Sequence, residues 1–286
     1  MSSTAIKRVE ADGVKVFYRE AGPVDAPVIL LLHGFPSSSH QYRNLIPLLS
    51  HKYRVIAPDL PGFGFTEVPD SRKYAYTFAS LAKTTEALLD VLNIKKFSVY
   101  IFDYGAPTAL RIALDRPEAV QAIITQNGNA YDAGLGEFWD PIRALWKDNS
   151  TENREKVRAG ILTLEATIWQ YEFGSKSVYA PEAPWLDWVL LSRPGNQEIQ
   201  LDLFYDYQTN VTLYPQFQEY FKASKVPVLA VWGKNDQIFI YPGAEAFKED
   251  LPDTELHLLD AGHFAIETNG KEIASLILRF LERNKI

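Results

Sequence analysis

The apolar run "VILLLHG" over residues 28–34 constrains the fold more than any other stretch of the chain. A strand with one face in water alternates apolar and polar residues, whereas an unbroken apolar run predicts a strand buried on both faces. Residues 78–94 carry apolar side chains at helical spacing. Strands that alternate with helices predict an α/β fold with a mainly parallel, twisted sheet flanked by helices. The other predicted strands are 14–20, 53–60, 97–102, 119–127, 226–233 and 255–260, and the other core helices lie near 243–249 and 270–284.

The alternation of strands and helices breaks between about residues 131 and 216. No buried strand is predicted there, and residues 151–173 and 196–211 each read as one helix, the first capped by Ser150 or Thr151. Large rings are concentrated in this stretch, which suits a helical insertion that buries its underside on the main domain. Five of the six tryptophans lie here: Trp139, Trp146, Trp169, Trp185 and Trp188.

The length of 286 residues fits one α/β domain with an insertion. We predict a core built from residues 1–132 and 217–286, with a helical cap over residues 133–216.

Composition narrows the class of function. The net charge of −7 and the lack of a Lys/Arg cluster argue against a nucleic-acid partner, and no stretch of about 18 apolar residues predicts a membrane span. The absence of cysteine excludes disulfides and a cysteine nucleophile. The first residues lack the apolar core of a secretory signal. We expect a cytoplasmic enzyme, monomeric or homodimeric, that acts on a small molecule.

An aspartate follows a predicted buried strand in "VYIFDYGAP", residues 99–107. The strand ends at Phe102, Asp103 comes next, and Gly105 precedes a helix-like run. This strand–turn–helix pattern is typical of a nucleophile elbow, here with Asp where Ser is usual. The alternative is that Asp103 only caps the helix. Because burying a charge is costly, a chemical role for Asp103 is favoured.

Two further features at predicted strand ends complete a possible catalytic set. His263 lies in the loop "AGHF" after the last strand, and Asp236 follows the strand before it. The chain order of nucleophile, acid and histidine is that of the nucleophile-elbow hydrolases. "HGFP" at 33–36 follows a buried strand, so its backbone N–H groups can stabilise a developing anion. Taken alone, each feature has a plainer interpretation as a packed histidine or a tight turn.

These motifs, together with "DLPGFGFT" at 59–66, resemble the α/β-hydrolase superfamily over nearly the whole chain. Within the superfamily, an aspartate at the elbow is similar to the epoxide hydrolases and to the haloalkane and haloacetate dehalogenases. The resemblance implies the α/β-hydrolase fold, with Asp103 as nucleophile, His263 as base and Asp236 as the acid that orients it.

A carboxylate nucleophile suits attack on a saturated carbon. The attack gives a stable alkyl ester that water then hydrolyses, so one hard step becomes two easier ones. His263 would activate that water while Asp236 holds its tautomer, and the backbone N–H groups of Phe35 and Tyr104 would bind the oxyanion. No step requires a metal or an organic cofactor. We expect hydrolysis of a small apolar epoxide, with dehalogenation as the first alternative.

The cap is expected to distinguish these two reactions. An epoxide leaves as an alkoxide and needs proton donors, whereas a halide needs only weak donors such as indole or amide N–H groups. "WQYEF" at 169–173 is similar to the cap segment where epoxide hydrolases place one ring-opening tyrosine, and either Trp169 or Tyr171 takes that position. Tyr207 stands where the second cap tyrosine occurs. We expect Trp169, Gln170, Tyr171 and Tyr207 to contact the substrate; the alternative for each ring is apolar packing.

Departures from the family pattern leave other functions open. Tyr104 stands where many epoxide hydrolases and haloalkane dehalogenases have Trp, and this weakens the dehalogenase interpretation more, because that Trp helps to hold the halide. Haloacetate dehalogenases have arginines where this chain has Tyr104 and Pro107, which disfavours small haloacids. The further alternatives are hydrolysis of an ester, lactone or C–C bond with Asp103 as base, and ligand binding without catalysis.

Overall fold

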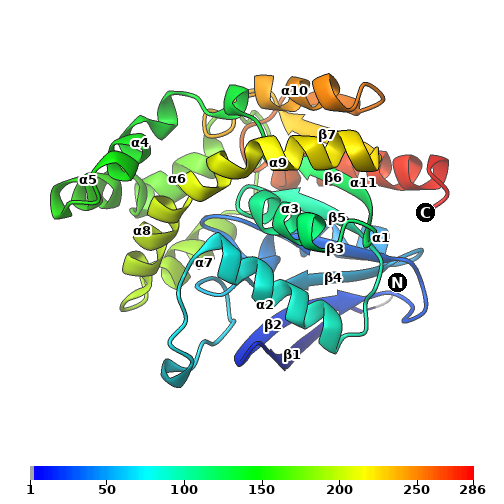
Figure 1. The fold of residues 1–286 in the computed structure, drawn as a ribbon, viewed down its shortest axis with the longest axis horizontal. Helices are drawn as coiled ribbons and strands as arrows, with labels where there is room; N and C mark the ends of the chain where they lie inside the picture. The colour runs from blue at the N-terminus through cyan, green and yellow to red at the C-terminus, as the bar shows by residue number, and fades with distance from the viewer. Residues whose placement is uncertain (1–2) are drawn as a thin grey trace.

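The computed structural model describes residues 3–286, and its centre is a twisted eight-stranded sheet with the order β1-β2-β4-β3-β5-β6-β7-β8 (Figure 1). β2 is antiparallel to β1 and β4, and the other neighbouring strands pair in parallel. Each strand predicted from the sequence is present, with small differences at the ends. The strands are β1 (Ala5–Ala11), β2 (Val14–Ala21), β3 (Val28–Leu32), β4 (Arg54–Pro58), β5 (Phe97–Phe102), β6 (Val120–Gln126), β7 (Val228–Gly233) and β8 (Glu255–Leu259).

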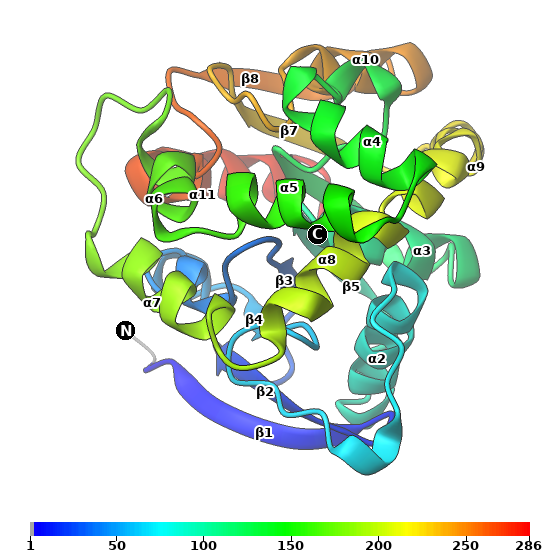
Figure 2. The same cartoon turned by 90° about the vertical axis from the view of Figure 1, so that its left-hand side faces the viewer.

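Helices cover both faces of the sheet (Figures 1 and 2). No helix within residues 3–286 has the length and apolarity to cross a bilayer. The helices of the two core segments are α1 (Ile46–Leu49), α2 (Phe78–Val91), α3 (Gly105–Asp115), α10 (Pro242–Asp250) and α11 (Ala265–Arg283). The helices between β6 and β7 are α4 (Asp140–Lys147), α5 (Thr151–Ile161), α6 (Leu164–Glu172), α7 (Glu182–Leu191), α8 (Asn196–Asp206) and α9 (Gln208–Ser224).

The central strands are buried on both faces, as the apolar run in β3 predicts. Leu30 and Leu32 belong to the core cluster that includes α2 and α3, whereas Ile29 and Leu31 belong to the cluster that includes α1 and α11. Successive side chains of a strand point to opposite faces, so a strand between two helical layers needs an apolar residue at every position.

The helices between β6 and β7 differ from their predicted bounds. Residues 151–173 form two helices, because Leu162 leaves the helical conformation and Thr163 starts α6 by accepting a hydrogen bond from the N–H of Ala166. Ser150 caps α5 as predicted. The predicted helix 196–211 is also split, since α8 ends at Asp206 and α9 continues to Ser224. The predicted cap boundary at residue 216 therefore lies inside α9.

The parallel strands end at one edge of the sheet, and this edge positions the candidate site. The segments after β3, β5, β6, β7 and β8 carry Phe35, Asp103, Asn127, Asp236 and His263, respectively. The helices α5, α6 and α8 lie in front of the sheet in the view of Figure 2. In open α/β sheets, ligands bind outside the carboxyl ends of the strands, so this edge is the expected place of a ligand site.

Candidate active site

Asp103 lies on a sharp turn between β5 and α3. Its backbone φ is +47°, a left-handed conformation that residues with a side chain rarely adopt. Two glycines make room for the turn: a Cβ on Gly105 would lie 2.2 Å from the carbonyl oxygen of Leu32, and a Cβ on Gly34 would lie 2.1 Å from Asp103 Oδ1. This is the strand–turn–helix arrangement that presents a nucleophile at the sheet edge.

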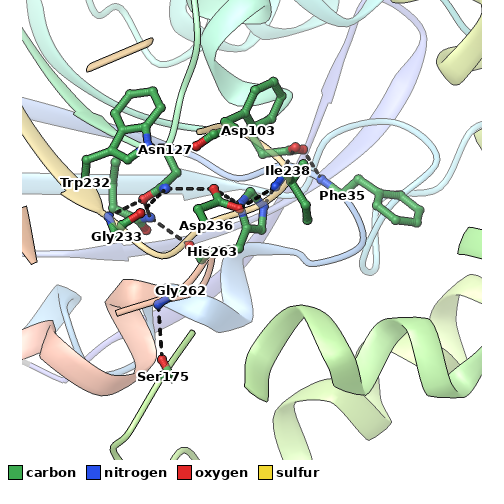
Figure 3. Close-up of polar contacts among 12 residues, drawn as sticks. Phe35, Asp103, Asn127, Ser175, Trp232, Gly233, Asp236, Ile238, Gly262 and His263 are labelled. Carbon is green, nitrogen blue, oxygen red and sulfur yellow. Dashed lines mark hydrogen bonds and ion pairs between the residues drawn. The ribbon is translucent and has the colours of Figure 1, made fainter. Parts of the chain in front are cut away.

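The two oxygens of the Asp103 carboxylate have different surroundings (Figure 3). Oδ1 accepts hydrogen bonds from the backbone N–H groups of Phe35 and Tyr104, both at 2.6 Å. Oδ2 accepts no hydrogen bond within residues 3–286 and lies 3.9 Å from His263 Nε2. The structure thus brings the two predicted oxyanion donors onto one oxygen and leaves the other oxygen available for attack.

Burial raises the pKa of Asp103 to about 6. The His263 ring and the N–H groups of Phe35 and Tyr104 act in the opposite direction, because they stabilise the charged form. Asp103 is therefore largely ionised at neutral pH although it is only 3% exposed. A carboxylate that has lost most of its hydration is a stronger nucleophile than one in water.

His263 and Asp236 form the second half of the arrangement. His263 Nδ1 lies 2.8 Å from Asp236 Oδ2, and since a carboxylate only accepts, Nδ1 carries the proton. His263 Nε2 is buried and has no hydrogen-bond partner within residues 3–286, so its lone pair faces Asp103. Burial disfavours the charged ring, but the charge and hydrogen bond of Asp236 outweigh it and raise the pKa of His263. The imidazole can therefore accept a proton from a water molecule.

Asn127 fixes Asp236, and the sequence interpretation missed it. Its Nδ2 donates to Asp236 Oδ2 at 2.7 Å, and its Oδ1 accepts from the N–H of Gly233 at 2.9 Å. The N–H of Ile238 donates to Asp236 Oδ1 at 2.7 Å. The available signal was position, since Asn127 directly follows β6 and parallel neighbours end at the same edge. Figure 3 shows this chain of contacts from Asn127 through Asp236 to His263.

Trp169 and Gln170 lie beside His263. Together with His263 and Asp236 they line a narrow gap. The buried Gln170 Oε1 has no hydrogen-bond partner within residues 3–286, and the Trp169 side chain is only partly buried. Of the two residues considered for the first cap position, Trp169 is therefore the one beside His263, and Gln170 follows it.

Tyr171 is directed away from His263, toward Asp187 and Phe264, which argues against the predicted contact of its hydroxyl with a substrate. Its hydroxyl donates to Asp187 at 2.5 Å, and its ring stacks on Phe264 with centroids 3.8 Å apart. Residues two apart on a helix lie about 200° apart around its axis, so Trp169 and Tyr171 cannot share one face of α6. Burial raises the pKa of Asp187 to about 8, so this contact is mainly between two protonated groups at neutral pH.

Tyr207 lies between α8 and α9 and is fully buried. Its hydroxyl is 3.3 Å from the hydroxyl of Tyr214, which accepts a hydrogen bond from Asn129 Nδ2 at 3.1 Å. Either hydroxyl can donate in this contact, and when Tyr214 is the donor the proton of Tyr207 is free for a ligand. Burial, above all, and the nearby charge of Asp103 raise the pKa of Tyr207, so it stays protonated.

Comparison with known proteins fits this geometry. Residues 27–270 match the family model described as the alpha/beta hydrolase fold. The chain belongs to this family. An uncharacterized hydrolase of Saccharomyces cerevisiae, YNR064C, is 48% identical over 96% of the chain and 95% of the yeast protein. This α/β hydrolase is thus an enzyme of the hydrolase type.

Haloalkane dehalogenases are also similar to this α/β hydrolase. The haloalkane dehalogenase of Psychrobacter cryohalolentis is 27% identical over 96% of the chain and 90% of its own length. The crystal structure of haloalkane dehalogenase DbeA from Bradyrhizobium elkani superposes with a TM-score of 0.78 at 21% identity, over 99% of both chains. The structural match shows that the fold is shared.

Proposed function

We propose that this α/β hydrolase opens small apolar epoxides through an alkyl ester on Asp103. One observation carries the proposal: Asp103 Oδ1 is held by two N–H groups, while Oδ2 lies 3.9 Å from the unpartnered Nε2 of His263. The aromatic rings around Tyr104, the residue after Asp103, support an apolar substrate, since the Tyr104 ring contacts those of Phe78 and Phe204.

In the first step, Asp103 Oδ2 attacks an epoxide carbon. The C–O bond of the ring breaks as the ester bond forms, and the leaving oxygen takes the free proton of Tyr207. The hydroxyl of Tyr214 then donates to the new phenolate and stabilises it. Proton donation by a positioned acid accelerates such a step about 10²- to 10⁴-fold.

In the second step, water attacks the ester carbonyl carbon and gives one proton to His263 Nε2. The oxyanion forms on Oδ1, where the N–H groups of Phe35 and Tyr104 already lie. The diol oxygen leaves with the proton of the imidazolium. The carboxylic acid that remains on Asp103 loses its proton, which restores Tyr207, so epoxide and water are converted to diol with the enzyme unchanged.

Dehalogenation by the same nucleophile is the second candidate. The indole N–H of Trp169 beside His263 favours it, because a weak neutral donor suits a halide. The similarity to haloalkane dehalogenases supports it as well. Tyr207 argues for the epoxide, because a halide ion leaves without a proton.

A paired assay separates the two functions. The enzyme is given a terminal aryl epoxide and a 1-bromoalkane of similar size, and diol and bromide are measured. We expect diol formation, with one heavy oxygen on Asp103 after a single turnover in heavy-oxygen water. Bromide release without diol formation would favour the second candidate, and unlabelled Asp103 would contradict the ester.

The Tyr207→Phe variant tests the proton donor in the same assay. We expect ester formation from the epoxide to slow by about 10²-fold, because the alkoxide then leaves without the acid. Tyr205→Phe is the matched control, since Tyr205 is only partly buried and lies two positions away. Equal rates for Tyr207→Phe and the wild type would contradict the role of Tyr207.

A further inference from the structure

Tyr104 has a buried hydroxyl with nothing to bind. The side chain is 1% exposed, and its hydroxyl has no hydrogen-bond partner within residues 3–286. Buried phenols almost always have a partner. The other fully buried tyrosines follow that rule, because Tyr42, Tyr100, Tyr171, Tyr207 and Tyr214 each make a side-chain hydrogen bond.

This hydroxyl belongs to the same neighbourhood as the nucleophile and Tyr207. Tyr104 directly follows Asp103, and its ring centroid is 5.9 Å from that of Tyr207. Burial and the charge of Asp103 raise the pKa of Tyr104, and Asp103 and Tyr104 both contribute to the raised pKa of Tyr207. Two phenols that keep their protons thus lie near one carboxylate.

Of the two cap tyrosines predicted as donors, Tyr207 is the one that lies near Asp103 in the part of the chain that the structure describes. Tyr171 donates to Asp187, and Trp169 takes the position beside His263. An indole N–H can bind an anion, but it is too weak an acid to compete with a phenol for an alkoxide. One cap donor therefore stabilises the charge on the leaving oxygen, unless the core provides a second donor.

We propose that the Tyr104 hydroxyl is the second donor to the leaving oxygen and acts together with the Tyr207 hydroxyl. This inference rests on the proposed epoxide chemistry. Tyr207 transfers its proton, because Tyr214 stabilises the phenolate that results. Tyr104 keeps its proton and donates a hydrogen bond to the oxygen as the C–O bond breaks. The residue thus has two roles: its backbone N–H binds Asp103 Oδ1, and its side chain binds the leaving oxygen.

The Tyr104→Phe variant separates these two roles, since it keeps the backbone N–H and the ring. In single-turnover experiments with a terminal aryl epoxide, we expect ester formation to slow by about 10- to 100-fold and hydrolysis of the ester to keep its rate. Tyr220→Phe, which changes a buried phenol on α9, is the control and is expected to leave both rates unchanged. Loss of both rates in Tyr104→Phe would indicate a structural role and overturn the proposal.

A series of epoxides with substituted aryl groups gives a second measurement. A donor to the leaving oxygen matters most when that oxygen is most basic, so the defect of Tyr104→Phe should shrink as the substituents become electron-withdrawing. A constant defect across the series would overturn the proposal. If Tyr207→Phe slows ester formation and Tyr104→Phe does not, this inference fails while the proposed function stands. If the wild type forms no diol, the proposed function itself fails.

Discussion

The core and the cap hold their parts of the candidate site in different ways. In the core, Asp103, Asp236 and His263 are fixed by hydrogen bonds of 2.6 to 2.8 Å, and within residues 3–286 Asp103 Oδ2 and His263 Nε2 are left without a hydrogen bond. In the cap, Gln170 Oε1 has no hydrogen-bond partner within residues 3–286, and the Tyr207 hydroxyl makes one hydrogen-bond contact there, at 3.3 Å. The core therefore presents a preorganised carboxylate and imidazole, whereas the cap presents polar groups that are open to a ligand.

This difference suggests that the core determines the rate and that the cap determines the choice of leaving group. Preorganised donors at the carboxyl end of a sheet stabilise charge without rearrangement, which is the largest contribution to many enzymatic rates. Donors that await a substrate distinguish one leaving group from another, because a buried polar group left unpaired disfavours the wrong ligand. Changes in the core should thus abolish turnover, and changes in the cap should alter which bond is broken.

The largest expected effect is at the nucleophile. Asp103→Asn should lower turnover of any true substrate by about 10⁴-fold or more, as the loss of a catalytic nucleophile does elsewhere. The matched control is Asp187→Asn, which changes another fully buried aspartate, on α7, whose raised pKa makes the neutral amide a close substitute. Steady-state assays of both variants test this, and an active Asp103→Asn enzyme would contradict the mechanism.

The next effect is at the base. In His263→Gln, water loses its proton acceptor while Asp103 Oδ2 remains free, so the ester should accumulate and turnover should fall by about 10³-fold. Intact-protein mass spectrometry should show a gain equal to the mass of the substrate, and peptide mapping should place it on Asp103. The double variant with Asp103→Asn is the control and should gain no mass. Absence of an adduct in His263→Gln would argue against the two-step route.

The same contrast explains what the sequence could predict. The buried strands and the turn at Asp103 are local patterns, and parallel topology brings the ends of neighbouring strands together without further information. Asp103, Asp236 and His263 could therefore be named from the sequence. Strand β1 was missed, because "AIKRVEA" is an edge strand that is mostly exposed and shows no buried face.

The cap was harder to predict, because its contacts depend on how helices cross. Periodicity gives the faces of a helix but not which face meets the core, so Trp169 and Tyr171 were equivalent in the sequence. The split between α5 and α6 at Thr163 was also missed, since a threonine cap inside a periodic run looks like any helical threonine. Asn127 was missed for another reason: an asparagine after a strand is usually a turn residue, and only its bond to Asp236 marks it.

An intermediate effect is expected from pH. Asp103, with a pKa of about 6, must be ionised to attack, and His263, with a raised pKa, must be neutral to accept a proton. Both requirements fail on acidification, so each step should slow by about tenfold per pH unit below the pKa of its group. Single-turnover rates between about pH 4.5 and 8 measure this. Asp236→Asn removes the main charge that raises the pKa of His263, so it should move the acid limb of ester hydrolysis to lower pH by more than that of ester formation, because Asp236 is only a minor cause of the raised pKa of Asp103.

The smallest effect on activity is expected at Tyr171. It tests whether Trp169 and Tyr171, which lie on different faces of α6, have different roles. Tyr171→Phe removes the hydrogen bond to the buried Asp187, which should cost about 1 to 3 kcal/mol of stability and lower the melting temperature by several degrees. Turnover measured well below that temperature should stay within about twofold of the wild type, because the hydroxyl faces away from His263. Trp169→Phe is the matched variant on the other face and should change the ratio of epoxide to bromoalkane turnover with little change in stability. The opposite result, a large loss of turnover in Tyr171→Phe and none in Trp169→Phe, would show that the cap donor had been assigned to the wrong face of the helix.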